Sequence, residues 1–133
     1  MTTQEKIEAF LAGGPHAVVG ASRDRQKFGN KVLRCYMQHD MPVYPVNPHE
    51  EEIEGLRAVA DLVSLPEAVH GVSIVTPPHI TERIVRDAIA QRVRFVWMQP
   101  GAESGRAIAL AEEAGLVVLA GGPCVLVSLG FEE

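Results

Sequence analysis

Residues 16–31 read His-Ala-Val-Val-Gly-Ala-Ser-Arg-Asp-Arg-Gln-Lys-Phe-Gly-Asn-Lys. The first four residues predict a buried strand, because they form a short apolar run that closes in Gly20. Apolar residues at helical spacing follow the polar loop and predict a helix: Val32, Leu33, Tyr36 and Met37. A strand, a glycine turn and a helix in this order are typical of the first unit of a parallel α/β sheet.

The same alternation continues along the chain. Short apolar runs predict further strands at 43–46, 72–75, 95–98 and 116–119, and a short one near 57–59. Amphipathic stretches predict helices before the first strand (with a capping box of Thr2 and Glu5), after the strand at 72–75 and over about 103–114. The inner face of the middle helix is expected to carry Ile80, Ile84, Val85, Ala88 and Ile89. Residues 49–57 are rich in glutamate and predict a solvated acidic loop. We therefore expect one domain over residues 1–133, a Rossmann-like, doubly wound, three-layer α/β fold with a mainly parallel sheet.

The composition argues against nucleic acids and membranes as binding partners. Lys and Arg number 12 against 17 Asp and Glu, so the net charge is −5, the opposite sign to that of a typical nucleic-acid or anionic-membrane binder. The sequence has neither a signal-peptide pattern nor an apolar run of the roughly 20 residues that cross a bilayer. Cys35 and Cys124 show no metal-ligand or disulfide spacing. We expect a cytoplasmic protein without nucleic-acid or membrane contacts, for which a homodimer or a protein partner stays open.

The ligand site of such a sheet lies at the carboxyl ends of the strands, where the strand order reverses. The segments that follow the predicted strands are small, polar or proline-bearing: 20–23, 47–48, 76–78, 99–101 and 121–124. Gly20 permits close backbone approach, and the next helix offers free N–H groups and its positive dipole end to a phosphate. The turn is not a GxGxxG motif, because the next glycine is Gly29. A tight turn without a ligand would look much the same.

Basic residues gather in the loop after this turn. Positions 23–31 carry a local charge of +3, which leaves −8 for the rest of the chain, and the charged residues are Arg23, Asp24, Arg25, Lys27 and Lys31. Cations near a helix N-terminus oppose the helix dipole, so helix stability does not explain them. A phosphate-rich ligand does, and the alternative is a solvated basic loop.

Two further segments indicate the kind of nucleotide. An NAD-binding fold usually has Asp or Glu at the end of its second strand, whereas this chain has Asn47 and Pro48. A neutral amide tolerates a phosphorylated ribose that a carboxylate would repel, which favours NADP, CoA or another phosphate-rich nucleotide. Residues 76–78 (Thr-Pro-Pro) predict a rigid apolar wall for a base or a pantetheine arm, or simply the start of a helix.

Four stretches together resemble the small stand-alone CoA-binding proteins: 17–22 with 27–30, 43–48, 75–78 and 96–103. These are Rossmann-like domains similar to the N-terminal domain of the succinyl-CoA synthetase α subunit. The resemblance implies that the Gly-Ala-Ser turn and nearby basic residues hold the CoA phosphates. It also implies that the Asn-Pro and Pro-Pro segments line the adenosine pocket and that Gln-Pro-Gly borders the pantetheine path. The cofactor it implies is CoA or acyl-CoA, held by Gly20, Ala21, Ser22, Arg23, Lys27, Phe28, Asn47, Pro48, Thr76, Pro77, Pro78, Gln99 and Gly101.

The residues outside these motifs carry no catalytic constellation. There is no GxSxG or HExxH motif, and synthetase chemistry uses a histidine in a second domain that this length does not hold. His16, His39 and His70 are expected to be structural or surface residues, while His49 and His79 lie nearer the crevice. Trp97 and Cys35 are expected in the core. Cys124, which follows the last strand, is a candidate for a mixed disulfide with CoA.

These features favour a non-enzymatic protein that binds CoA or acyl-CoA and acts as a carrier, sensor or regulatory module. Two alternatives stay open. One is an NADP-dependent oxidoreductase whose basic loop reads the 2′-phosphate. The other is a protein-interaction subunit whose nucleotide site has decayed.

Overall fold

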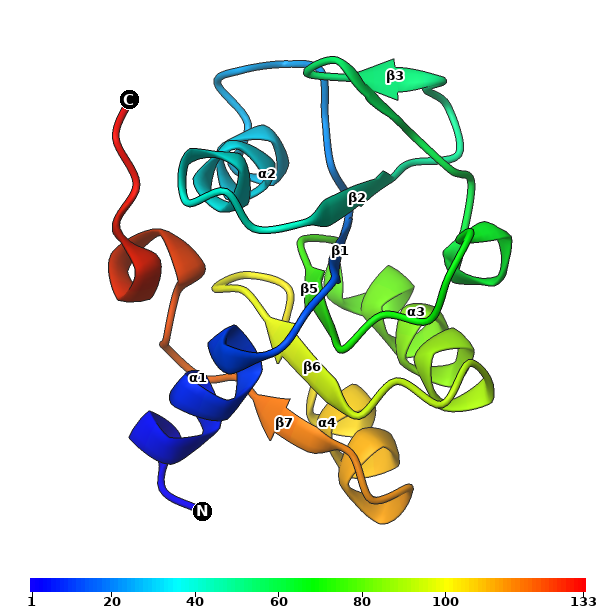
Figure 1. The fold of residues 1–133 in the computed structure, drawn as a ribbon. Coiled ribbons are helices and arrows are strands. Elements are labelled where there is room, and N and C mark those ends of the chain that lie inside the picture. Colours follow the sequence, from blue (N-terminus) through cyan, green and yellow to red (C-terminus); the bar gives the residue numbers. More distant parts are fainter.

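A five-stranded parallel sheet forms the centre of the computed structural model, which describes residues 1–133 (Figure 1). Across the sheet the strands run in the order β2 (Val43–Val46), β1 (His16–Val19), β5 (Gly71–Ile74), β6 (Phe95–Met98) and β7 (Val117–Leu119). His16 lies opposite Val43 of β2 and opposite Gly71 of β5, and both pairings are parallel. The chain moves outward in one direction from β1 to β2 and in the other from β5 onward, so the strand order reverses between β1 and β5.

Helices cover both faces of this sheet. In Figure 1, α1 (Thr3–Ala12) and α2 (Phe28–Gln38) lie on one side, and α3 (Pro78–Ala90) and α4 (Gly105–Glu113) lie on the other. Each face has its own hydrophobic cluster, and neighbouring residues of a strand alternate between them: Ala17 belongs to the α3–α4 side and Val18 to the α1–α2 side. The predicted doubly wound, three-layer fold is confirmed.

The predicted capping box at the first helix is also present. The Thr2 Oγ1 atom accepts a hydrogen bond from the Glu5 N–H, and the Glu5 carboxylate accepts one from the Thr2 N–H. Two short helical turns complete the chain: η1 (Leu62–Ser64) before β5 and η2 (Leu126–Gly130) after β7. No helix combines the length and the apolar character that crossing a membrane requires.

The acidic segment 49–57 differs from its prediction. It holds an antiparallel hairpin of β3 (Glu52–Ile53) and β4 (Leu56–Arg57) instead of a plain solvated loop. Glu54 and Gly55 join the two strands with φ values of 51° and 80°, the left-handed pair that two-residue hairpin turns need. Ile53 is 1% exposed and packs with the residues of α2, and the partly buried Leu56 packs on the same cluster, so two apolar side chains anchor a hairpin rich in charge. Beyond β4, the strand expected near 57–59 continues only as a parallel bridge between Val59 and Val46.

His16 occupies the core at the start of β1, as a structural residue. Its Nε2–H donates to the Phe10 carbonyl oxygen at 2.8 Å, whereas the buried Nδ1 atom has no hydrogen-bond partner. The imidazole stacks on the ring of Tyr36, with the ring centroids 5.2 Å apart. Burial lowers the pKa of His16 below its ordinary value, because a proton on Nδ1 would place an unsolvated charge in the core.

We expect this histidine to make folding sensitive to acid. Its pKa is lower in the folded chain than in the unfolded chain, so its contribution to stability is complete above pH 6.5 and falls as the pH drops below that value. A single proton of this kind lowers the free energy of unfolding by up to about 1.4 kcal/mol per pH unit. Urea unfolding between neutral and mildly acidic pH measures the slope. His16→Gln should reduce it, while His79→Gln, at an exposed histidine, should not; equal slopes in the two variants contradict the assignment.

Candidate functional site

The turn after β1 brings the sheet edge and the start of α2 into direct contact. Gly20 has a φ of 94°, and a Cβ atom there would lie 2.2 Å from the Val75 carbonyl oxygen. Gly29, in the first turn of α2, packs against Gly20 so closely that a Cβ atom on Gly29 would lie 2.0 Å from the Gly20 carbonyl oxygen. The helix therefore begins directly on the turn, although residues 21–27 loop out between them.

Backbone N–H groups at this contact are free. Those of Ser22, Arg23, Phe28 and Gly29 donate to no acceptor within the protein. The last two belong to the first turn of α2, whose N-cap residue, Lys27, makes no capping hydrogen bond with its side chain. Free N–H groups at a helix N-terminus attract anions, both by direct hydrogen bonds and through the helix dipole. The turn therefore has the geometry of an anion site.

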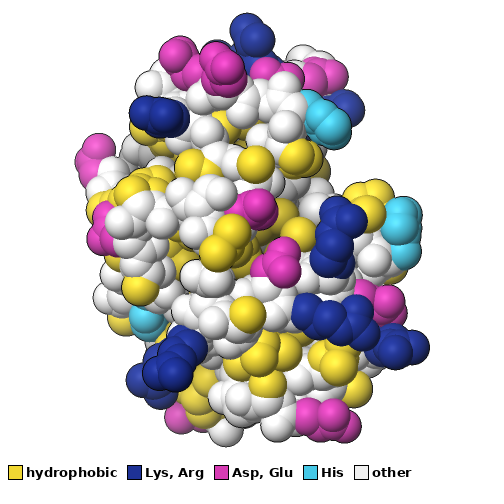
Figure 2. All heavy atoms as spheres, turned by 90° about the vertical axis from the view of Figure 1, so that its right-hand side faces the viewer, with side chains coloured by type: hydrophobic (Ala, Val, Ile, Leu, Met, Phe, Trp, Pro, Cys, Tyr) yellow, Lys and Arg dark blue, Asp and Glu magenta, His cyan; other side chains and the backbone are white.

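Carboxylates of the acidic segment 49–57 pair with two cations of the basic loop. The Arg23 guanidinium lies 3.6 Å from the Glu50 carboxylate, and that of Arg25 lies 3.5 Å from the Glu54 carboxylate. Figure 2 shows acidic and basic side chains side by side at the end of the molecule that carries β3. Asp24 is the one acidic residue within positions 23–31, but the fold adds Glu50 and Glu54 beside the loop.

The other two cations of positions 23–31 differ from each other, and Lys31 lies in α2 instead of in the loop. The Lys31 ammonium lies 3.0 Å from the Glu133 carboxylate, whereas Lys27 is exposed and forms no ion pair. Arg23 also borders a polar hollow of about 630 Å³ together with His49 and four glutamates. Of the four cations, Lys27 at the start of α2 is therefore the one that the protein leaves without a counter-charge.

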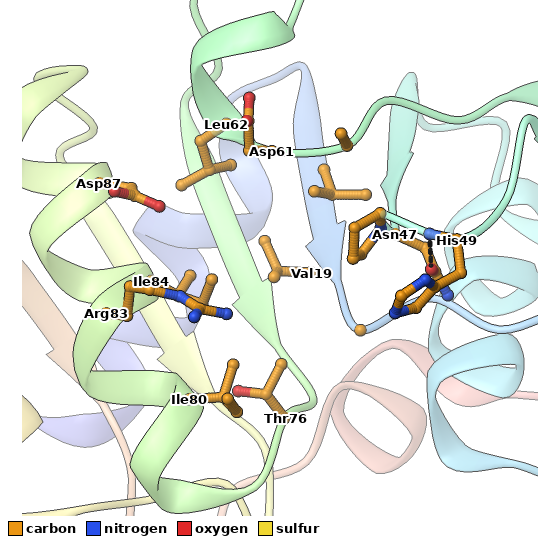
Figure 3. A pocket seen from close by; sticks show the side chains of 14 residues that line it. Val19, Asn47, His49, Asp61, Leu62, Thr76, Ile80, Arg83, Ile84 and Asp87 are labelled. Carbon is orange, nitrogen blue, oxygen red and sulfur yellow. Dashed lines mark hydrogen bonds between the residues drawn. The ribbon is translucent and has the colours of Figure 1, made fainter.

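A cleft of about 580 Å³ opens at the carboxyl ends of β1, β2 and β5 (Figure 3). It combines apolar and polar side chains. The apolar ones include Val19, Val46, Leu62, Ile80 and Ile84, and the charged or titratable ones are His49, Asp61, Arg83 and Asp87. In Figure 3 the Arg83 side chain extends from α3 toward the middle of the cleft, and His49 lies on the opposite wall. Four of the predicted site residues line this cleft: Gly20, Asn47, Pro48 and Thr76.

Asn47 holds two walls of the cleft together. Its Nδ2 atom donates to the Ala21 carbonyl oxygen at 2.8 Å, and its Oδ1 atom accepts from the His49 N–H at 2.8 Å. Both ends of the amide are therefore used within the protein, which ties the turn after β1 to the turn after β2. A carboxylate could not donate to the Ala21 carbonyl oxygen, so this contact requires the amide.

A smaller hollow of about 260 Å³ lies beside the cleft and is called the second hollow, with the cleft as the first. Its lining holds three more predicted residues, Phe28, Pro77 and Gly101, and also Pro100, Val75 and Ala102. Thr76 lines both this hollow and the cleft, and its hydroxyl is held by a hydrogen bond of 2.8 Å to the Thr81 hydroxyl. The two hollows and the anion site are thus neighbours along one edge of the sheet.

The remaining predicted residues lie outside both hollows. Pro78 is the exposed first residue of α3, and Ala21 is buried behind the turn. Gln99 is fully buried, and its Oε1 atom accepts from the Val125 N–H at 3.0 Å, so its side chain holds the segment after β7. Ligand contacts for these three residues stay predictions.

Part of the cleft was not expected from the sequence. Residues 60–62 lie just before and within η1, and Arg83 and Asp87 lie on α3, so none of them directly follows a strand. A signal was nevertheless present: Ile80 and Ile84 mark the inner face of α3, and Arg83 and Asp87 stand next to that face at the same four-residue spacing.

The two cysteines have different surroundings. Cys35 is fully buried in α2, and burial raises the pKa of its thiol to about 11, so it is a packing residue as predicted. Cys124 is half-buried and lines neither the cleft nor the second hollow. A mixed disulfide between Cys124 and CoA stays a prediction.

Curated relatives of this chain are much longer proteins that are named as CoA ligases or CoA synthases. The α subunit of an ADP-forming acetate–CoA ligase II from Pyrococcus furiosus is 39% identical over 81 residues, which are 60% of this chain and 18% of that subunit. A trans-feruloyl-CoA synthase is 29% identical over 92 residues, which are 68% of this chain and 13% of the synthase. The chain thus spans less than a fifth of either relative.

Solved structures of similar size share the whole fold. A hypothetical protein from Pyrococcus horikoshii OT3 is 29% identical, with a TM-score of 0.90 over 96% of this chain and 89% of that one. A protein from Thermus thermophilus is 30% identical, with a TM-score of 0.87 over 96% of each chain. A family model described as a CoA binding domain matches residues 16–130, which include β1, the cleft and all of the sheet. The chain therefore belongs to the CoA binding domain family.

Proposed function

We propose that this protein binds CoA or acyl-CoA across the carboxyl edge of its sheet. The adenosine occupies the cleft, the diphosphate lies on the turn between Gly20 and α2, and the pantetheine arm follows the second hollow. The observation that carries the proposal is the group of free N–H donors at Ser22, Arg23, Phe28 and Gly29, next to two hollows that share Thr76. An elongated ligand with a diphosphate in the middle, a nucleoside at one end and a pantetheine arm at the other matches this order.

The cleft suits a nucleoside. Its apolar side chains, among them Val19, Val46 and Ile84, offer contact to the flat faces of a base. The charged groups of Asp61, Arg83 and Asp87 offer hydrogen bonds to its edges and to the sugar. The second hollow is walled by Phe28, Pro77 and Pro100, which suits the apolar stretches of a pantetheine arm.

We further propose that the protein is a carrier, sensor or regulatory module and does not turn its ligand over. The titratable side chains of the cleft, His49, Asp61, Arg83 and Asp87, form no hydrogen-bonded pair of nucleophile and base. His49 is exposed, and its backbone, not its imidazole, bonds to Asn47. Binding without chemistry is the activity that these groups support best.

Calorimetry with CoA, acetyl-CoA, NADP and NAD tests this function. We expect heat from CoA and acetyl-CoA and little from the two dinucleotides. A preference for NADP would contradict the proposal and favour a nicotinamide-dependent oxidoreductase. No heat from any of the four ligands would favour a protein-interaction role with a decayed nucleotide site.

Lys27 provides a sharper test of where the phosphates lie. Because it stands unpaired at the start of α2, Lys27→Ala should weaken CoA about tenfold, the loss of one charge-assisted contact. Lys31→Ala removes the same charge from a residue paired with Glu133 and should change the affinity little. Equal losses in the two variants would show a general charge effect and contradict the assignment. A larger loss for CoA than for dephospho-CoA would place Lys27 at the 3′-phosphate, and equal losses would place it at the diphosphate.

A further inference from the structure

Arg34 carries a charge that the protein buries without a counter-ion. The residue lies in the middle of α2 and is 8% exposed, yet its guanidinium has no carboxylate within ion-pair distance. Buried charges are costly unless they are paired or well hydrogen-bonded. The position of this cation, behind the loop of residues 21–27, therefore calls for an explanation.

The guanidinium holds that loop at two points, once by a direct bond and once through Asn30 of α2. Its Nε–H donates to the Asn30 Oδ1 atom at 2.7 Å, and one terminal N–H donates to the Arg25 carbonyl oxygen at 3.2 Å. Asn30 links Arg34 to the start of the loop, because its Nδ2 atom donates to the Ser22 carbonyl oxygen at 2.8 Å. Arg34 thus holds the loop near its beginning, through Asn30, and near its end, directly.

These bonds orient the peptide groups of the loop. The carbonyl oxygens of Ser22 and Arg25 are engaged by donors from α2, while the N–H groups of Ser22 and Arg23 stay free. An anion is repelled by carbonyl oxygens and attracted by N–H groups, so this orientation favours an anion on the loop. The positive charge of Arg34 adds to that preference from the protein side.

The C-terminal segment covers this cation. The Phe131 ring lies beneath the guanidinium, with 5.1 Å from the Arg34 Cζ atom to the ring centroid, a distance typical of a cation–π contact. The same segment is held along α2 by hydrogen bonds between Gln38 and the Glu132 backbone and by His39, which donates to the Gly130 carbonyl oxygen. Phe131 therefore covers one face of the Arg34 guanidinium.

We propose that Arg34 is a positioning residue for the diphosphate of the ligand: it fixes the loop of residues 21–27 with its N–H groups free and supplies buried positive charge behind it. This inference rests on the proposed function, because it assumes that the diphosphate binds at the turn. It adds a residue that lines neither the cleft nor the second hollow and acts on the ligand through the loop. A merely structural Arg34 would support the whole fold equally and would not distinguish one ligand from another.

The experiment compares two ligands that share a nucleoside and differ in phosphate, namely ADP and adenosine. In Arg34→Met, which keeps the apolar stem, we expect ADP to bind at least tenfold more weakly while adenosine, which lies in the cleft alone, changes by less than about twofold. Shifts of protein NMR signals report both affinities, and urea unfolding reports the stability of each variant. Phe131→Leu, which keeps an apolar cover, serves as the matched control and should leave the ADP affinity within about threefold of the wild type.

Arg34→Lys is the second variant, and it also serves if Arg34→Met does not fold. It keeps a charge but cannot bond to Asn30 and Arg25 through one planar fork, so ADP should still bind more weakly than to the wild type. Unchanged ADP affinity, or an equal loss for ADP and adenosine, would overturn the positioning role. Failure of the wild-type protein to bind either ligand would overturn the proposed function, and this inference with it.

Discussion

Gly29→Ala should weaken CoA binding by at least tenfold and destabilise the protein, although alanine is the better helix former. In most helices this change stabilises by up to about 1 kcal/mol. Here the new Cβ atom would lie 2.0 Å from the Gly20 carbonyl oxygen and 3.3 Å from the Ala21 Cα atom. Both are backbone atoms, so the start of α2 must move away from the turn. The free N–H groups then no longer converge, and we expect a loss of about 1–3 kcal/mol in the free energy of unfolding.

Gly105→Ala is the matched control for this experiment. Gly105 is the first residue of α4, and a Cβ atom there would meet nothing within 4 Å. We expect this variant to bind CoA as the wild type does and to be equally or slightly more stable. Calorimetry and urea unfolding measure both properties. If Gly29→Ala behaved like Gly105→Ala, the contact between α2 and the turn would not matter for the site.

Trp97→Ala should cost about 3–5 kcal/mol in the free energy of unfolding, the largest stability effect that we expect from a single substitution. Trp97 is fully buried in β6, its ring packs edge-on against Phe10 with centroids 5.2 Å apart, and its Nε1–H donates to the Pro123 carbonyl oxygen at 3.0 Å. The variant loses a large apolar volume at the contact between the sheet and α1. Because it also removes the only tryptophan, circular dichroism in urea is the suitable measurement.

Trp97→Phe separates packing from hydrogen bonding at this position. The ring keeps most of the apolar contact, and the loss of the bond to Pro123 should cost about 1–2 kcal/mol. CoA affinity should stay near that of the wild type, because Trp97 lines neither the cleft nor the second hollow. A strong loss of CoA binding without a loss of stability would instead make Trp97 a stacking platform for the ligand.

The strands and their parallel arrangement were predictable because each is a short, nearly continuous apolar run. Such runs are typical of strands buried on both faces, and β1, β5 and β6 consist only of buried residues. The hairpin of β3 and β4 escaped prediction because its apolar content is confined to Ile53 and Leu56. Glutamates dominate that stretch, and a hydrophobic pattern this short does not distinguish a hairpin from a loop.

The site was predictable where it consists of residues that directly follow a strand, such as Gly20, Asn47 and Thr76. It was not predictable where contact depends on the path of a loop. Gly29 stands nine positions after Gly20, too far for a known glycine motif, yet the intervening loop folds out and lets the two glycines touch. The role of Arg34 was not predictable for the same reason, since its contact with Arg25 exists only because the loop turns back on α2.

The hairpin that folds over the basic loop changes how ligand binding should respond to salt. Arg23 and Arg25 already hold carboxylates, so a phosphate that reaches them exchanges one anion for another instead of meeting bare cations. Added salt screens the attraction of the phosphate, but it also screens the carboxylates that compete with it. The two effects oppose each other at these arginines. Affinity should therefore fall less steeply with ionic strength than the number of cations in the loop suggests, and most of the remaining slope should come from Lys27.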